Sequence, residues 1–326
     1  MKNWLLLSCL WLVGCAGFQG VQLPTHEISS AEQLGVSGLE FSPDGQHFAT
    51  SSVRGEVTVW SYPGKQKKWT FWEHAGRVQS IHWAGNEKLI TGGNDRKIIL
   101  YDLQAGTVTA TELQLNSTIN SLGFLASKNW VVSGHLDGTV RVHTLPDLKF
   151  INSFETDETV MAVAVSSKGV IASAGDGGQT LLFESDLNKP REITRSSRDA
   201  AELRFSRDGQ KLLGSGWKLL IWDVTSGQLT MRDTGHIGAF SSVDISPDYK
   251  YYATIGCSAD ARVQLFDFKT GEVARQLAPH NNCGTSVRFT PNGQFVVSAA
   301  EDERVRFFDI TIPYKPEMMQ NESSSL

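Results

Sequence analysis

Short runs of alternating apolar and polar residues recur along nearly the whole chain, and each ends on a large apolar residue just before a turn. These first-strand anchors return about every 41 residues. A second series, mostly aromatic, keeps the same spacing. Such alternation is typical of β-strands, and this period with four short strands per unit is typical of propeller blades. We therefore predict an all-β protein with a seven-bladed β-propeller fold. The anchors are Phe41, Trp83, Phe124, Val165, Phe205, Ile245 and Phe289; the second series is Trp60, Tyr101, His143, Phe183, Trp222, Phe266 and Phe308.

The repeats resemble those of the WD-repeat family. One copy keeps the dipeptide that names the family, Trp222-Asp223, and the resemblance covers roughly residues 25–312. In that family a His, a Ser or Thr, an Asp and a Trp form a hydrogen-bonded tetrad inside a blade. The resemblance implies a WD-repeat propeller and a role in binding other proteins.

Three repeats carry most of such a tetrad. A His stands nine residues before the first-strand anchor and an Asp six residues before the second-series aromatic, with a hydroxyl residue between them. A His–Asp couple at fixed spacing also suits catalysis or metal binding. We assign it to structure, because it recurs in three units and a buried polar group needs a partner. The predicted structural tetrads are His74, Thr91, Asp95 and Tyr101; His236, Thr254, Asp260 and Phe266; and His280, Ser298, Asp302 and Phe308.

The last repeat lacks the sequence for its outer strand. Pro313 and Pro316 follow Phe308-Asp309 where other repeats have a glycine turn, and Pro ends strand pairing. The segment Thr25–Ser29 precedes the first repeat and has no place in it. We predict that this N-terminal segment supplies the missing strand and closes the ring, as in WD-repeat proteins, which removes an open sheet edge.

The N-terminus has the features of a lipoprotein signal. Lys2 precedes an apolar run at residues 4–13, which suits a signal peptide and is too short to span a bilayer. The run ends in Leu12-Val13-Gly14-Cys15, which resembles the bacterial lipobox. That resemblance implies acylation of Cys15, and Ala16 after it implies sorting to the outer membrane, on the periplasmic side. The alternative is a plain secretory signal with a chance cysteine.

The domain organisation follows from these assignments. We expect a lipoprotein signal peptide at 1–14, a lipidated tether at 15–24, the propeller at 25–314 and a disordered tail at 315–326. The length of 326 residues suggests two domains, but the repeat overrides this, because one blade cannot bury its apolar faces alone.

Composition and motifs exclude several classes of function. The net charge is -5 and the Lys and Arg residues are scattered, whereas nucleic-acid binding rests on clustered cations. We find no phosphate-binding glycine loop, nucleophile elbow or metal-ligand spacing of Cys and His. The sequence therefore predicts no catalytic residue, no cofactor, no metal and no nucleic-acid partner.

The loops between the second and third strands are the candidate binding surface. They share one rim of the ring with the links that join the blades, and loops on a rigid scaffold are common recognition sites. Trp217 is notable, since Trp and Arg are frequent interface hot spots; the alternative is that it folds onto the neighbouring blade. The candidate rim residues are Arg54, Arg96, His135, Trp217, Arg262 and Arg304.

Two cysteines of the predicted domain fall in neighbouring loops of adjacent blades. Cys257 lies in a loop of the sixth repeat, and Cys283 lies in the link from the sixth to the seventh. An oxidising periplasm would allow a disulfide between them. The alternative is a pair of buried, reduced thiols that act as small apolar residues.

Together, these features favour a non-enzymatic, protein-binding scaffold on the periplasmic face of a bacterial outer membrane. Envelope assembly is one concrete role, by loose analogy with the propeller lipoprotein of the β-barrel assembly machinery. The alternative is a hydrolase or small-ligand binder that uses the central channel. Polar side chains converging on one channel mouth would favour that alternative.

Overall fold

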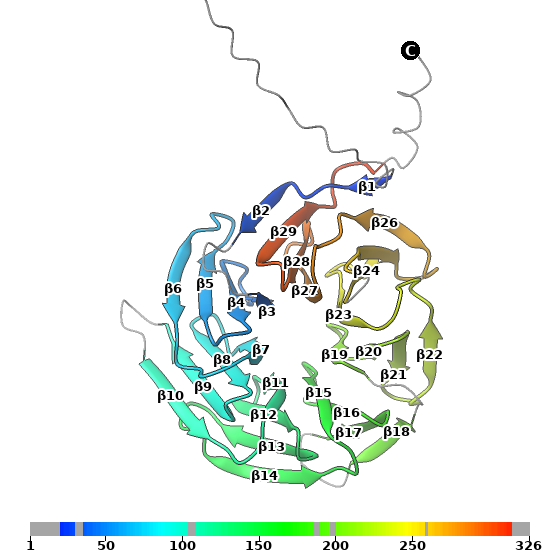
Figure 1. Cartoon of the computed structure of the whole chain (residues 1–326). Coiled ribbons are helices and arrows are strands. Elements are labelled where there is room, and N and C mark those ends of the chain that lie inside the picture. The colour runs from blue at the N-terminus through cyan, green and yellow to red at the C-terminus, as the bar shows by residue number, and fades with distance from the viewer. Residues whose placement is uncertain are drawn as a thin grey trace, which may run out of the picture.

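Seven small sheets stand around a central channel in the computed structural model (Figure 1), which describes residues 20–29, 35–103, 109–184, 190–195, 200–257 and 260–314. Within these ranges every regular element is a strand. The fold is the predicted seven-bladed β-propeller. No helix with the length and apolarity to cross a membrane occurs in the same ranges. The predicted signal peptide, Cys15 and the tail at 315–326 lie outside them.

The first four blades are each built from four consecutive strands. Blade 1 contains β3 (Val36–Phe41), β4 (His47–Ser52), β5 (Val57–Ser61) and β6 (Lys67–Phe71); blade 2 contains β7 (Val78–Trp83), β8 (Lys88–Gly93), β9 (Lys97–Asp102) and β10 (Thr109–Gln114); blade 3 contains β11 (Ile119–Leu125), β12 (Trp130–His135), β13 (Thr139–Thr144) and β14 (Phe150–Glu155); blade 4 contains β15 (Val160–Val165), β16 (Ile171–Gly175), β17 (Gln179–Phe183) and β18 (Arg191–Arg195).

Blade 5 repeats this pattern, whereas blades 6 and 7 each take in a strand from the N-terminus. Blade 5 contains β19 (Glu202–Phe205), β20 (Lys211–Ser215), β21 (Leu219–Asp223) and β22 (Leu229–Arg232); blade 6 contains β23 (Phe240–Ile245), β24 (Tyr251–Gly256), β25 (Val263–Asp267), β26 (Val273–Leu277) and β1 (Val21–Gln22); blade 7 contains β27 (Gly284–Phe289), β28 (Phe295–Ala300), β29 (Arg304–Asp309) and β2 (His26–Ser29).

The hydrophobic core lies between the blades. The buried apolar side chains form seven clusters, and each cluster joins two neighbouring blades. The predicted anchors supply many of these side chains: Trp83 packs at the interface of blades 1 and 2, and Phe289 at that of blades 6 and 7. Because each sheet buries its faces against its neighbours, the blades depend on one another for stability.

The N-terminal strand β2 closes the ring, as predicted. It pairs antiparallel with β29, with His26 opposite Phe307 and Ser29 opposite Arg304. Glu27 adds ion pairs to this junction, because its carboxylate lies 2.7 Å from Nε of Arg306 and 3.2 Å from Nη1 of Arg304. This pairing gives blade 7 its outer strand, although that strand comes from the N-terminal end of the described chain.

The preceding strand β1 was not predicted, and it corrects the assignment of residues 15–24 as a tether. Val21 and Gln22 pair in parallel with β26 of blade 6, opposite Gln276 and Leu277. Gln22 also reaches blade 7, where its side chain donates to the Asp309 carbonyl at 2.7 Å. The folded ring therefore begins before residue 25, and the N-terminal segment bridges the last two blades.

A form that starts at Ala31 should melt below a form that starts at Gly17. The shorter form loses β1, β2 and the Glu27 ion pairs, which together contribute an estimated 2–4 kcal/mol, or roughly 5–10 °C in Tm for a domain of this size. Differential scanning calorimetry measures the difference. Equal melting temperatures would show that the ring does not depend on its N-terminal strands.

Candidate functional site

The strand order gives the ring two unlike rims. Within each blade the chain passes from the innermost to the outermost strand. The loops between second and third strands therefore lie at the same end as the links between blades, and together they form the interblade rim. The first–second and third–fourth turns form the opposite turn rim. Backbone bonds tie loop to link on the interblade rim: Asn94 N–H donates to the Arg77 carbonyl at 3.0 Å, and Leu136 N–H to that of Thr118 at 3.1 Å.

The three predicted tetrads form His-centred networks below the interblade rim. In blade 2, His74 Nδ1 lies 3.0 Å from both Asp95 carboxylate oxygens, and His74 Nε2 lies 2.7 Å from the Thr91 hydroxyl. The same Asp accepts a hydrogen bond from Ala75 N–H at 3.0 Å. The equivalent networks join His236 to Asp260 (3.2 Å) and Thr254 (2.8 Å), and His280 to Asp302 (2.9 Å) and Ser298 (2.7 Å).

These networks hold the links in place, and their hydroxyl residues Thr91, Thr254 and Ser298 are fully buried. Burial lowers the pKa of His236 and of His280, and the facing carboxylates offset this only in part. The rings of His236 and His280 are therefore neutral at pH 7: Nδ1–H donates to the Asp, and Nε2 accepts from the hydroxyl. The fourth members, Tyr101, Phe266 and Phe308, are buried aromatics that pack beside the network.

His135 is not available on the interblade rim, which corrects its assignment as a binding residue. The side chain is fully buried at the end of β12, and its Nε2 lies 2.8 Å from the Ser133 hydroxyl. Ser133 occupies the position that Thr91 holds in blade 2. In blade 3 the histidine that contacts this hydroxyl group is therefore His135, which belongs to the same strand. Burial, followed by the charge of Arg141, lowers the pKa of His135 to about 4.

The other candidate rim residues divide into two groups. Arg54, Arg96 and Trp217 are exposed on the interblade rim. Arg262 and Arg304 instead make ion pairs: Arg262 Nε lies 2.6 Å from Asp260, and Arg304 pairs with Glu27 at the ring closure. The available cations are thus fewer than the sequence suggested.

Further apolar side chains, which the sequence analysis missed, accompany Trp217 on this rim. Ile237 lies in the link between blades 5 and 6, close to the Trp217 loop, because Phe240 N–H donates to the Gly216 carbonyl at 2.8 Å. Trp72 and Leu136 lie on other links and loops of the same rim. The exposed fractions are 54% for Trp72, 56% for Leu136, 57% for Trp217 and 68% for Ile237.

A disulfide joins Cys257 and Cys283, so the structure adopts the first of the two alternatives for these cysteines. Their Cα atoms lie 4.1 Å apart, and the bridge connects the long loop of blade 6 to the link that enters blade 7. The two cysteines are 26 positions apart in the sequence. By the chain-entropy estimate such a closure stabilises the folded state by about 3 kcal/mol.

The channel contains a ring of residues that immediately precede the first-strand anchors. Alternation along a strand turns this position away from the anchor and toward the channel. Blades 3 and 4 contribute only Gly123 and Ala164 there, and they border a cavity of about 270 Å³. The full ring is Glu40, His82, Gly123, Ala164, Arg204, Asp244 and Arg288.

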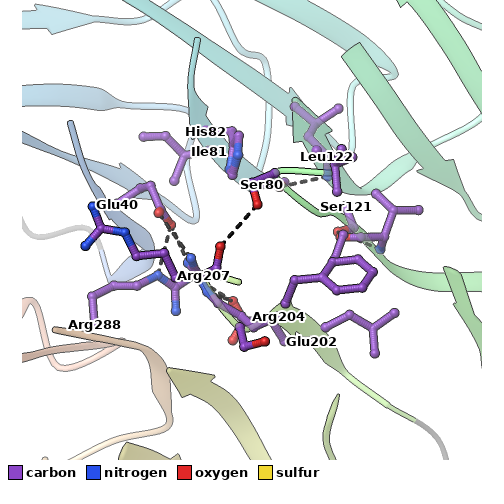
Figure 2. A pocket seen from close by; sticks show the side chains of 18 residues that line it. Glu40, Ser80, Ile81, His82, Ser121, Leu122, Glu202, Arg204, Arg207 and Arg288 are labelled. Atoms are coloured by element: carbon purple, nitrogen blue, oxygen red, sulfur yellow. Dashed lines mark hydrogen bonds and ion pairs between the residues drawn. The ribbon is translucent and has the colours of Figure 1, made fainter. Parts of the chain in front are cut away.

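Charged members of this ring pair across the channel (Figure 2). Arg204 Nη2 of blade 5 lies 2.5 Å from Glu40 of blade 1, on the far side of the ring. Arg288 of blade 7 bridges Glu40 (2.9 Å) and Glu202 (2.6 Å). Asp244 lies 3.8 Å from Nε of Arg204. The two guanidinium groups therefore connect blades 1, 5, 6 and 7, which do not all adjoin one another.

The pKa values show how strongly this cluster is coupled. Burial would raise the pKa of Glu40, but Arg204 and Arg288 outweigh it and lower the pKa to about 2. Burial raises the pKa of Asp244, and the same arginines offset this only in part. Burial lowers the pKa of His82, so this ring stays neutral at pH 7. The cluster therefore contains two positive charges and up to three negative ones.

The sequence held a signal for this cluster that the analysis did not use. The position before the anchor is charged in four of the seven repeats, which is unusual for a strand core. Three positions before the anchor, most blades have a hydroxyl or carboxyl group that stitches neighbouring first strands together. Examples are the bonds from Leu122 N–H to Ser80 (3.0 Å), from Val163 N–H to Ser121 (3.0 Å) and from Val287 N–H to Ser242 (3.1 Å).

No group of three His, Cys, Asp or Glu side chains within the described ranges has the arrangement of a metal site. The sites that the structure offers are therefore the interblade rim, with exposed apolar and cationic side chains, and the cavity beside the channel cluster.

Sequence comparison identifies WD40 repeats in four places. The family described as "WD domain, G-beta repeat" matches residues 22–61, 65–102, 108–144 and 271–309. Each match covers the outer strand of one blade and the first three strands of the next. The first match therefore begins with the strand that completes blade 7. The chain is a seven-bladed β-propeller that contains WD40 repeats in these four places.

Similar curated proteins are longer than the chain, and about a quarter of the aligned residues are identical. Protein tipD of Dictyostelium discoideum is 23% identical over 83% of the chain and 39% of its own length. Pre-mRNA-processing factor 19 homolog 2 of Arabidopsis thaliana is 25% identical over 67% of the chain and 42% of its own length. WD repeat-containing protein WDS homolog of the same plant is 23% identical over 93% and 60%. The chain thus spans about two fifths of the first two relatives.

Removing Arg288 from the channel cluster should destabilise the ring. Arg288→Met removes one of the two arginines that pair with Glu40 and Glu202, which we expect to lower the free energy of unfolding by about 2–4 kcal/mol. Arg207→Ala, at an exposed arginine beside the same cavity, should change it by less than about 0.5 kcal/mol. Urea unfolding measures both.

The double variant Arg288→Met with Glu40→Gln tests whether the loss comes from the ion pair. We expect a coupling energy of at least about 1 kcal/mol between the two sites. Additive effects, or an Arg288→Met protein as stable as the wild type, would contradict the account of the cluster.

The disulfide should be present in protein exported to an oxidising compartment. Intact mass after alkylation under denaturing, non-reducing conditions is expected to show Cys257 and Cys283 unmodified. The paired substitution Cys257→Ser and Cys283→Ser should lower the free energy of unfolding by about 2–4 kcal/mol. Two alkylated thiols at these positions in the exported protein would refute the bridge.

Proposed function

We propose that the protein is a non-enzymatic scaffold that binds a protein partner through its interblade rim. The observation that carries this proposal is the set of four large apolar side chains exposed on that one rim: Trp72, Leu136, Trp217 and Ile237, each more than half exposed. Arg54 and Arg96 are exposed on the same rim. Apolar anchors with arginine nearby are the usual composition of a protein-binding hot spot.

The rim can present these groups because the networks beneath it are rigid. The Asp members of the three tetrads accept hydrogen bonds from the backbone N–H groups of Ala75, Ile237 and Asn281 in the middle of each link. Ile237 is thus fixed through its backbone while its side chain faces solvent. A surface held in its bound conformation loses little entropy on binding, which favours affinity.

We further propose that Cys15 anchors the scaffold as a lipoprotein on the periplasmic side of a bacterial outer membrane, with envelope assembly as its role. The support is the sequence signal: the apolar run, the lipobox-like Leu12-Val13-Gly14-Cys15 and Ala16 after it. The Cys257–Cys283 disulfide agrees with an oxidising compartment. Two or more acyl chains would give stable attachment.

A small-ligand binder in the channel is the second candidate, and the cavity of about 270 Å³ favours it. Polar side chains do converge there. However, Arg204 and Arg288 already pair with Glu40 and Glu202, so the cations are neutralised within the protein. Thermal-shift screening against metabolites and cell-wall fragments separates this candidate, or a hydrolase at the same place, from the scaffold.

Crosslinking in intact cells followed by affinity capture tests the scaffold. The wild-type protein should capture one protein in stoichiometric amount. Trp217→Ser combined with Ile237→Ser should reduce capture at least tenfold, because two apolar anchors are lost. Phe150→Ser is the matched control: Phe150 is 56% exposed but lies on the outer strand of blade 3, and capture should not change.

Cys15→Ser tests the anchor in the same cells. We expect the variant to leave the outer-membrane fraction or to remain unprocessed. Unchanged fractionation and processing would refute the lipoprotein assignment. Equal capture by the wild type and the rim variant would refute the binding surface.

A further inference from the structure

The described chain begins and ends at one place on the ring, the outer edge where blade 6 meets blade 7 (Figure 1). The Tyr314 hydroxyl donates to the Gly20 carbonyl. Arg275 of β26 binds both segments: its guanidinium donates to the Gln22 side chain at 3.0 Å and to the Ile310 and Ile312 carbonyls at 2.7 and 2.9 Å. The position at which residue 20 joins the ring is therefore fixed.

Exposed apolar side chains lie on each of the three segments that meet at this edge. Leu23, which follows β1, is 66% exposed; Val273, at the start of the paired strand β26, is 50% exposed; and Ile312, whose carbonyl binds Arg275, is 48% exposed. They come from three separate segments. They stand apart from the apolar side chains of the interblade rim, which belong to blades 1, 3 and 5 and to the link that enters blade 6.

A positive charge lies on the neighbouring blade. Lys65 Nζ, in the last turn of blade 1, is 5.1 Å from the centre of the Phe307 ring, against which His26 of β2 also packs. Lys67 and Lys68 follow it and are exposed. Glu27 of β2 is neutralised by Arg304 and Arg306; Glu272, beside Val273, is the exposed acidic residue of this edge. The edge is thus apolar with mixed charge around it.

Chain length limits how far this edge can lie from an acyl group on Cys15. Gly20 is five positions after Cys15, and in any conformation this stretch spans at most about 18 Å. A domain of this size has a radius of gyration of about 19 Å. The ring cannot turn its far side to the lipid without leaving the reach of that connection. The part that stays closest is the edge with Leu23, Val273 and Ile312.

We propose that this edge, formed by Leu23, Val273 and Ile312 around the start of β1, is a membrane-contact surface that rests on the lipid to which Cys15 is anchored. The inference depends on the anchor of the proposed function. The three side chains enter the interface between headgroups and acyl chains, as apolar groups beside an acyl anchor do. The ring then stands on its edge, which leaves both rims open to proteins.

Site-specific quenching on vesicles tests the proposal. The full-length, processed lipoprotein carries a single fluorescent label through Ile312→Cys and is reconstituted into vesicles of phosphatidylethanolamine and phosphatidylglycerol. Phe150→Cys is the matched control, because Phe150 is exposed to a similar extent on the outer strand of blade 3. The readout is the ratio of quenching by a nitroxide-bearing lipid to quenching by aqueous iodide. We expect this ratio to be at least threefold higher at position 312 than at 150.

A second variant isolates the contact from the anchor. Leu23→Asp with Val273→Asp, in the Ile312→Cys protein, should leave flotation with the vesicles unchanged and reduce the quenching ratio to that of position 150. Flotation with equal ratios at 312 and 150, or a ratio that the Asp substitutions do not change, overturns the membrane-contact surface while the anchor stands. Failure of the processed protein to float refutes the anchor, and the proposed surface falls with it.

Discussion

Closure of the ring is the constraint on which the rest of the structure depends. Each blade buries its apolar faces only against its neighbours, so an unclosed ring would expose two faces at once. The junction is made by β2 beside β29, and its cluster joins Phe48 and Trp60 of blade 1 to Phe307 of blade 7, with Ile28 packed alongside. The N-terminal strand therefore completes one blade while its own repeat begins in the next.

Closure at the outer edge is matched by crosslinks at the centre. Side chains of the first strands bind the backbone of the next blade, as in the bond from Thr285 to the Val36 carbonyl at 2.8 Å, which joins blade 7 to blade 1. Arg204 and Arg288 then connect blades that are not neighbours. A buried cluster of ion pairs adds little stability compared with apolar side chains of similar volume. Losing one member, however, leaves a buried charge without its partner. It therefore fixes which blades face one another across the channel.

The repeat pattern predicted the features that depend on local sequence. It could not predict contacts between residues that are far apart in the sequence. The anchors, the His–Asp offsets and the missing outer strand each follow from spacing, and β2 and the three tetrads lie where that spacing put them. The strand β1 has only two residues, too few for a periodic signal. His135 resembles a loop residue in sequence, but its side chain is buried. It takes the place beside Ser133 that a histidine of the preceding link takes beside the hydroxyl group in blades 2, 6 and 7. The pairing of Glu40 with Arg204 joins residues 164 positions apart, which no repeat could reveal.

Both proposals, the lipid anchor and the binding rim, rest on the segments that hold the ring together. The same segment that closes the ring fixes where the chain would leave for Cys15, and the tetrads that hold the links keep Trp217 and Ile237 on the surface. Photo-crosslinking in intact cells tests the central claim, that partners bind the interblade rim. A photoreactive residue at Arg54 or Arg96 should yield one discrete crosslinked protein, whereas one at Lys168 or Asp208 on the turn rim should not. A crosslink confined to the turn-rim positions would contradict the account.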